Sequence, residues 1–175
     1  MQDALQTMPD TKRLANLIGF VIRAHDRFPR EPRKRFRKWD QRTPYAIHPV
    51  WCAMTILTEM SLPEDVRQDG ALALLLHDIL EDTMELLPSD LSPRVEALVE
   101  EMTFESYERE VEDIWNRSEV CHLLKLYDKV SNLLDANWRT DKRDQYVAYT
   151  LRLCETVEQR WGTLNIVRIA RAIAI

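Results

Sequence analysis

Glycine is scarce in this chain: three glycines, Gly19, Gly70 and Gly162, occur among 175 residues. Glycine-rich phosphate loops and tight hairpins need many backbone positions with positive φ, which glycine adopts at little cost. Three glycines are too few for such folds. The scarcity disfavours a Walker-type nucleotide-binding loop, a dinucleotide-binding Rossmann fingerprint and a turn-rich β-sandwich.

Cysteine is equally scarce, and its three positions are far apart. Cys52, Cys121 and Cys154 form no CxxC spacing, and their number is odd. This pattern argues against a disulfide framework and against a structural zinc site of the cysteine type. A reducing compartment suits such a chain, so we expect a cytoplasmic protein.

The sequence also lacks a long apolar run. The most apolar N-terminal stretch, residues 17–22, is interrupted by Gly19 and followed at once by Arg23, His25 and Asp26. A spanning helix needs about 20 apolar residues, and a signal peptide needs an uninterrupted apolar centre. We therefore expect neither of them, and no membrane partner.

No excess of positive charge is present: 24 basic residues stand against 29 acidic ones, for a net charge of −5. Such a balance gives no general attraction to nucleic acid, and we expect no nucleic-acid partner. Basic residues do gather in residues 30–38. This segment leaves room for a local anion site, and an RNA-binding module built on it is the weakest of the alternatives.

Helical periodicity dominates the sequence, and no sustained alternation of apolar and polar residues occurs. The length suits one domain, so we expect an all-α fold formed by residues 1–175. Ser61 with Glu64 resembles a capping box, and Ser92 with Pro93 resembles a helix start. The basic segment up to Pro44 should be a loop, because prolines bound it and only Phe36 and Trp39 could anchor it. Helices are expected over residues 10–28, 46–60, 61–82, 92–102, 107–116, 119–137, 142–161 and 164–175.

The expected helix over residues 61–82 contains the string LLLHDILEDT. On a helix, His77, Asp78, Glu81 and Asp82 would share a sector roughly 140° wide. No lysine or arginine balances these like charges on that face, although neighbouring like charges repel. A divalent metal would explain an imidazole beside three carboxylates. The alternative is the polar face of an amphipathic helix, with His77 partly in the core.

Two further residues stand in apolar surroundings. His48 lies in TPYAIHP, and Asp128 lies in LLKLYDKVSNLL. An isolated carboxylate is costly to bury. Separately, His48 could be an ordinary core histidine, and Asp128 could pair with Lys129 or with an arginine. One metal ion bound by both residues would explain them together.

These motifs resemble the HD superfamily of metal-dependent phosphohydrolases. The order of His48, the dyad His77–Asp78 and Asp128 is the HD pattern. More narrowly, TPYAIHP, ALLLHDILEDT and KLYDKVSNLLD are similar to the hydrolase domain of RelA/SpoT-type alarmone enzymes. The resemblance implies a single-domain helical HD-type bundle that removes the 3′-pyrophosphate from guanosine tetra- or pentaphosphate. It implies Mn²⁺ bound by His48, His77, Asp78 and Asp128, with Glu81 and Asp82 as catalytic residues that orient or activate water.

The resemblance also implies positions that contact the nucleotide substrate, a small molecule. These positions are Arg37, Lys38, Asn132, Arg143 and Tyr146. The chain departs from the family in two places. Extra residues, PREPRKR, follow His25, and the family's basic phosphate-contact position falls near Ser106, with no cation before Arg109.

Two alternatives to alarmone hydrolysis stay open. The first is an HD-type phosphohydrolase that acts on another nucleotide, which the altered loop and the missing cation favour. The second is a catalytically silent nucleotide-binding protein, which the retained cluster of like charges disfavours. We expect the resident ion to be Mn²⁺ or another divalent metal.

Overall fold

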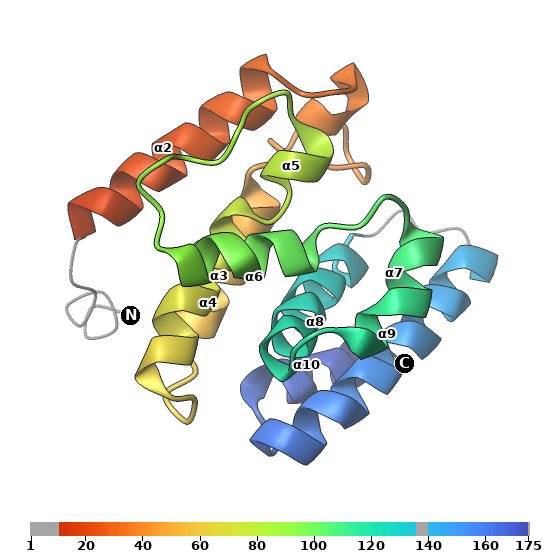
Figure 1. Cartoon of the computed structure of the whole chain (residues 1–175). Coiled ribbons are helices and arrows are strands. Elements are labelled where there is room, and N and C mark those ends of the chain that lie inside the picture. The colour runs from red at the N-terminus through yellow and green to blue at the C-terminus, as the bar shows by residue number, and fades with distance from the viewer. Residues whose placement is uncertain (1–10, 136–139, 175) are drawn as a thin grey trace.

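The computed structural model describes residues 11–135 and 140–174, which form helices and no β-strand (Figure 1). The predicted all-α fold is confirmed. The α-helices are α2 (Thr11–Arg27), α3 (Ile47–Leu57), α4 (Glu64–Leu76), α5 (Ile79–Asp82), α6 (Pro93–Met102), α7 (Tyr107–Asp113), α8 (Glu119–Leu133), α9 (Thr140–Trp161) and α10 (Asn165–Ile173). Two short 3₁₀ helices are η1 (Pro32–Arg35) and η2 (Ile114–Asn116). The predicted end residues at positions 10, 136–137 and 175 lie outside the described residues.

Of the two helix starts predicted from the sequence, the one at Ser92 is confirmed and the one at Ser61 is wrong. Ser92 caps α6 as predicted, because its Oγ accepts a hydrogen bond from the backbone N–H of Val95 at 3.3 Å. The capping box at Ser61 is wrong: Pro63 occupies the N-cap position of α4. The Ser61 hydroxyl instead donates to Glu59 Oε1 at 2.8 Å.

The single helix predicted over residues 61–82 is also wrong, because the chain leaves regular helix between α4 and α5. His77 Nδ1 lies 2.7 Å from the carbonyl oxygen of Leu74. In a continuous helix that carbonyl would accept from the backbone N–H of Asp78. The imidazole competes for it, so His77 and Asp78 occupy the break between the two helices.

Helix α8 is central to the bundle. It contacts α3, α4 and α6 as well as α9 and α10 (Figure 1). Twelve of its 15 residues are buried, and these include Lys125, Asp128 and Lys129. Charged groups in such a position must pair with one another, because an isolated buried charge is costly.

The loop between α2 and α3 is fixed at its base by backbone pairing. The N–H of Arg30 donates to the carbonyl of Asp82, and the N–H of Met84 donates to the carbonyl of Phe28, both at 2.8 Å. A second bridge joins Phe36 to Pro44. Of the two residues that could anchor the loop, Phe36 forms this bridge, and Trp39 is 45% exposed. The loop therefore lies against α5, next to the HD dyad.

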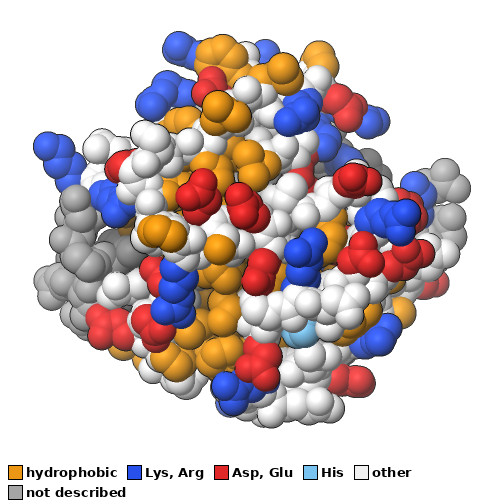
Figure 2. Space-filling model, in the orientation of Figure 1, with side chains coloured by type: hydrophobic (Ala, Val, Ile, Leu, Met, Phe, Trp, Pro, Cys, Tyr) orange, Lys and Arg blue, Asp and Glu red, His pale blue; other side chains and the backbone are white. Residues whose placement is uncertain are grey.

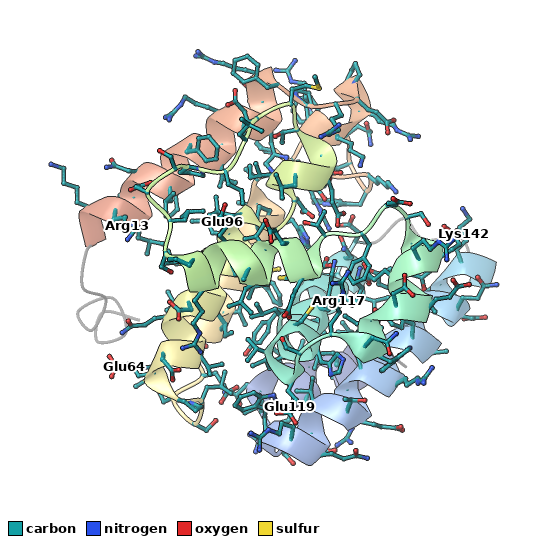
Figure 3. All side chains as sticks on the ribbon, in the orientation of Figure 1. Arg13, Glu64, Glu96, Arg117, Glu119 and Lys142 are labelled. Atoms are coloured by element: carbon teal, nitrogen blue, oxygen red, sulfur yellow. The ribbon has the colours of Figure 1, made fainter. Side chains whose placement is uncertain are left out.

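The outer surface carries mixed charge. Acidic and basic side chains alternate over the face seen in Figure 2, with apolar groups between them. Glu64, Glu119 and Lys142, which Figure 3 labels, are exposed at the edge of the bundle. Among the described residues, no helix combines the length and the apolar character needed to cross a membrane.

Candidate active site

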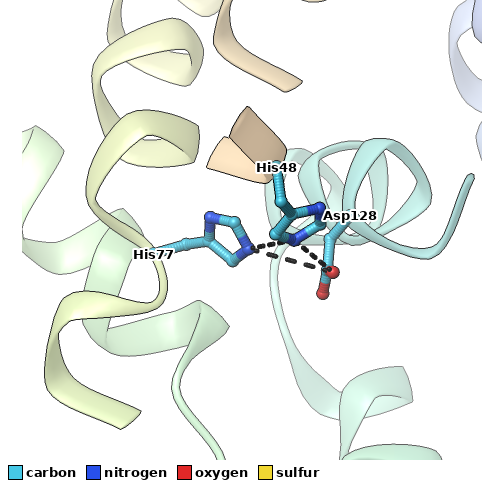
Figure 4. A group of neighbouring side chains, drawn as sticks. All are labelled: His48, His77 and Asp128. Carbon is cyan, nitrogen blue, oxygen red and sulfur yellow. Dashed lines mark hydrogen bonds and ion pairs between the residues drawn. The ribbon is translucent and has the colours of Figure 1, made fainter. Parts of the chain in front are cut away.

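Three side chains from different parts of the bundle converge in its interior (Figure 4). His48 comes from the first turn of α3, His77 from the break after α4, and Asp128 from the middle of α8. The two imidazole Nε2 atoms lie 3.2 Å apart. Asp128 Oδ1 lies 3.3 Å from Nε2 of His48 and 3.8 Å from Nε2 of His77. All three side chains are almost fully buried.

The convergence of these atoms suits one divalent metal ion. Ligands about 2.1 Å from an ion at tetrahedral or octahedral angles lie about 3.0–3.4 Å from one another, which matches the 3.2 and 3.3 Å separations, while the 3.8 Å separation is longer. The donor atoms of the three residues all lie within 4.8 Å of one another. The Nδ1 atom of His77 contacts the Leu74 carbonyl, and Nδ1 of His48 lies 2.8 Å from Ser131 Oγ. With a proton on each Nδ1, both Nε2 atoms offer a lone pair to an ion.

Asp78 lies beside the same two imidazoles. Its Oδ1 is 3.2 Å from Nε2 of His77, and its Oδ2 is 3.5 Å from Nε2 of His48. The hydroxyl of Tyr45 donates to Oδ2 at 3.0 Å, which orients the carboxylate. The structure thus brings together all four residues predicted as metal ligands. Metal binding by all four stays a prediction.

The two oxygens of Asp128 have different partners. Oδ1 faces the imidazoles and accepts a hydrogen bond from Asn132 Nδ2 at 2.8 Å. Oδ2 forms ion pairs with Lys125 at 3.3 Å and with Lys129 at 3.0 Å. Burial alone would raise the pKa of Asp128, but the lysines outweigh it and hold the pKa well below the usual range. Asp128 therefore forms the ion pair with Lys129 that the sequence offered as an alternative to metal binding, and its other oxygen also faces the two histidines.

The lysines have a second carboxylate partner that the sequence did not reveal. Glu110 of α7 lies 3.1 Å from Nζ of Lys125 and 2.7 Å from Nζ of Lys129, and it also accepts from the Tyr149 hydroxyl at 2.9 Å. A buried network thus joins α7, α8 and α9 behind Asp128. The spacing of Lys125, Asp128 and Lys129 on an otherwise apolar helix was the signal that such a partner exists.

The imidazoles differ in their affinity for protons when no metal is considered. Burial lowers the pKa of His48. Burial acts in the same direction on His77, but the carboxylates of Asp78 and Asp128 outweigh it and raise the pKa to about 9. A bound metal needs the lone pair that this proton would occupy, so protons and metal compete for His77.

Glu81 and Asp82 lie on α5, just after the dyad. Glu81 Oε1 accepts from the backbone N–H of Phe104 at 2.9 Å, and burial raises the pKa of Glu81 to about 7. Asp82 forms an ion pair with Lys34 of η1. Burial raises the pKa of Asp82 as well. A carboxylate whose pKa is near 7 can accept a proton from water at neutral pH.

Two of the predicted substrate positions, Arg37 and Asn132, are in direct contact. Arg37 is 4% exposed, donates to Asn132 Oδ1 at 3.0 Å and to Asp135 Oδ1 at 3.2 Å, and lies over the Tyr45 ring. Lys38 is exposed. Asn132 thus links Arg37 to Asp128.

Arg143 and Tyr146 lie on α9. Arg143 donates to the carbonyl of Ile173 at 2.8 Å. Tyr146 is buried and stacks on Tyr107, with ring centroids 5.5 Å apart. Contact of these residues with a nucleotide stays a prediction.

A cavity of about 340 Å³ lies beside His48. Among the five predicted substrate residues, Arg37 lines it, and its remaining wall is mostly apolar and aromatic. The lining residues are Arg37, Trp39, Thr43, Ile47, His48, Val50, Trp51, Met54, Ser131, Leu134 and Asp135.

The known proteins to which this chain is similar are named as hydrolases of the same nucleotide. No family model matches the chain. The human protein guanosine-3′,5′-bis(diphosphate) 3′-pyrophosphohydrolase MESH1 is 28% identical over 154 residues, covering 79% of this chain and 84% of the relative. The mouse protein of the same name is 27% identical over the same shares. A solved structure titled "A metazoan ortholog of SpoT hydrolyzes ppGpp and plays a role in starvation responses" has a TM-score of 0.68 and 25% identity, covering 95% of this chain and 96% of that one. These similarities confirm the resemblance to HD-type alarmone hydrolases.

Proposed function

We propose that this chain is a metal-dependent phosphohydrolase that removes the 3′-pyrophosphate from guanosine tetra- or pentaphosphate, a small-molecule nucleotide. The observation that carries the proposal is the convergence of His48, His77 and Asp128 to within metal-ligand distances of one another. Relatives named as 3′-pyrophosphohydrolases of this nucleotide, similar over most of the chain, support it. We also propose that residues 1–175 form one HD-type domain.

His48, His77, Asp78 and Asp128 would hold the ion, which we propose to be Mn²⁺. When bound, a divalent ion stabilises negative charge on phosphate oxygens and lowers the pKa of water from about 15.7 towards about 7. The chain's own residues orient the ligands for this purpose. Tyr45 holds Asp78, while Asn132, Lys125 and Lys129 hold Asp128 in its ionised form.

Glu81 and Asp82 are the proposed proton acceptors. A water oxygen forms a bond to the 3′-linked phosphorus, and the bond from that phosphorus to O3′ breaks. One water proton passes to a carboxylate of the pair, and the protonated carboxylate then gives that proton to O3′ as the bond breaks, while the attacking oxygen stays on the pyrophosphate. Because the phosphorus bonded to O3′ is attacked, both phosphates of the 3′-diphosphate leave together as pyrophosphate.

The test of this function is a product analysis. With Mn²⁺ present, guanosine tetraphosphate should yield GDP and pyrophosphate in equal amounts in one step, without free orthophosphate. A panel of other nucleotides under the same conditions provides the comparison. Absence of pyrophosphate, together with rapid hydrolysis of another nucleotide, would replace the alarmone by that nucleotide.

The Glu81 and Asp82 carboxylates are expected to act in chemistry and not in metal binding. Glu81→Gln keeps an oxygen that accepts from Phe104, and Asp82→Asn keeps the shape of the side chain. Both variants should retain the metal, and at least one should lose about a hundredfold or more in kcat, the usual contribution of general-base help. Metal content and kcat at saturating Mn²⁺ measure the two effects. Near-normal kcat in both variants would assign the pair a structural role.

The substrate residues Arg37, Lys38, Asn132, Arg143 and Tyr146 remain proposed contacts. Arg37 donates to Asn132 and Asp135, so its guanidinium has fewer N–H groups left for a guanine base. This pairing favours a nucleotide other than a guanosine polyphosphate as the substrate. A related phosphohydrolase acting on another nucleotide is therefore the second candidate. The nucleotide panel distinguishes the two.

A further inference from the structure

The proposed centre is rich in negative charge, yet few cations face it. Four carboxylates, those of Asp78, Glu81, Asp82 and Asp128, surround a site whose proposed substrate is a polyanion. Lys125 and Lys129 pair with Asp128, but their side chains are 2% and 6% exposed and both also hold Glu110. They lie behind Asp128, so a phosphate group cannot reach them without disrupting the core.

The resemblance places a basic phosphate-contact residue near Ser106, and the structure shows no cation from that region at the centre within the described residues. The Ser106 hydroxyl accepts from the backbone N–H of Arg109 and caps α7. The Arg109 guanidinium pairs with Glu112, and both side chains are more than 60% exposed. Within the part of the chain that the structure describes, neither residue forms a hydrogen bond or an ion pair with the four carboxylates.

Lys34 supplies a cation from a different part of the chain. Its ammonium pairs with Asp82, whose side chain is 7% exposed, while the Lys34 side chain itself is 34% exposed. A lysine ammonium carries three N–H donors. One carboxylate does not use all three, and the partial exposure leaves the group accessible to a ligand.

The backbone around Lys34 fixes this position. Its N–H donates to the carbonyl of Glu31 at 2.8 Å within η1. Arg35, the next residue, pairs with Asp26 of α2 at 2.6 Å, and its carbonyl accepts from the N–H of Tyr45 at 2.8 Å. The Tyr45 hydroxyl in turn donates to Asp78. The lysine is therefore anchored between α2, α5 and the carboxylates of the centre.

We propose that Lys34 binds the anionic pyrophosphate group of the substrate while its ammonium remains on Asp82. Lys34 belongs to the basic segment of residues 30–38. Its ammonium brings to the carboxylates the positive charge that Arg109, paired with Glu112 on the surface, does not bring. Charge-assisted hydrogen bonds from an ammonium to phosphate oxygens are strong ones. This inference rests on the proposed function and deepens it by naming a residue that selects for a polyphosphate group.

The variant Lys34→Gln tests the proposal, with Arg33→Gln as the matched control. Arg33 also belongs to η1, but it pairs with Glu31 and is 73% exposed. The readouts on the Mn²⁺-loaded protein are the dissociation constant of inorganic pyrophosphate by calorimetry, and KM and kcat for guanosine tetraphosphate. Lys34→Gln should weaken pyrophosphate binding and raise KM by about tenfold or more. Arg33→Gln should change neither, and Lys34→Arg should restore most of the binding.

The outcomes separate this inference from the proposed function. If the wild type hydrolyses guanosine tetraphosphate but Lys34→Gln binds pyrophosphate within twofold of wild type, Lys34 is not a phosphate contact and the function stands. A fall in kcat alone, with KM and pyrophosphate affinity unchanged, would likewise overturn the inference, because Lys34 would then only position Asp82. If the wild type does not hydrolyse the alarmone but binds pyrophosphate through Lys34, the function fails and the inference stands. Absence of pyrophosphate binding by the wild type would overturn the inference.

Discussion

Replacement of His77 by alanine is expected to abolish both stoichiometric metal binding and hydrolysis. The variant removes one of two imidazoles that lie 3.2 Å apart at the centre. The remaining groups, His48 and the carboxylates of Asp78 and Asp128, would offer one nitrogen donor fewer. Loss of the ion removes charge stabilisation and water activation together, so kcat/KM should fall by roughly a thousandfold or more. Metal analysis after dialysis and the rate of pyrophosphate release measure the two losses.

His122→Ala is the control for His77→Ala. His122 is also buried, but its Nε2 contacts the carbonyl of Ile114 and not the metal cluster. This variant should retain one equivalent of metal per chain. Full metal content and normal turnover in His77→Ala would show that the cluster is a structural feature of the core and would contradict the proposed function.

Replacement of Glu110 by alanine is expected to destabilise the fold by about 3–5 kcal/mol, the usual cost of removing one member of a buried ion pair. The side chain of Glu110 is 7% exposed and pairs with Lys125 and Lys129, which are buried as well. Without it, two ammonium groups would share the single carboxylate of Asp128. The free energy of unfolding, from urea titration of the metal-free protein, measures the effect.

Glu112→Ala is the matched control, because Glu112 lies on the same helix and forms an exposed pair with Arg109. Exposed ion pairs contribute little, so this variant should unfold at nearly the wild-type urea concentration. Equal stabilities of Glu110→Ala and Glu112→Ala would mean that the buried lysines find other partners or water. The use of metal-free protein separates this effect from any loss of the ion.

The helical bundle and the convergence of the motifs could be predicted because both depend on local patterns. Apolar spacing gave the helices, and three short motifs placed His48, His77 and Asp128 together. The break between α4 and α5 could not be predicted. A hydrogen bond between the His77 ring and the Leu74 carbonyl accompanies it, and periodicity continues unchanged through that break.

The polar partners of the centre were largely missed for a different reason. Glu110 is separated from Lys129 by 19 residues, and Lys34 from Asp82 by 48. Such pairs leave no periodic trace in the sequence. Lys38, which the motif comparison selected, is exposed, whereas Lys34 pairs with Asp82 through a contact that no motif indicates.

The backbone pairing of Phe28 and Arg30 with α5 has an evolutionary consequence. Because this pairing closes the base of the loop, residues can be gained or lost beyond it without displacing His77 or Asp78. Such a loop is free to exchange one source of positive charge for another while the ligands stay constant. Descendants of a common ancestor could then keep the same reaction and diverge in the nucleotide they accept, and an alignment of loop residues by their order would pair side chains that occupy different places.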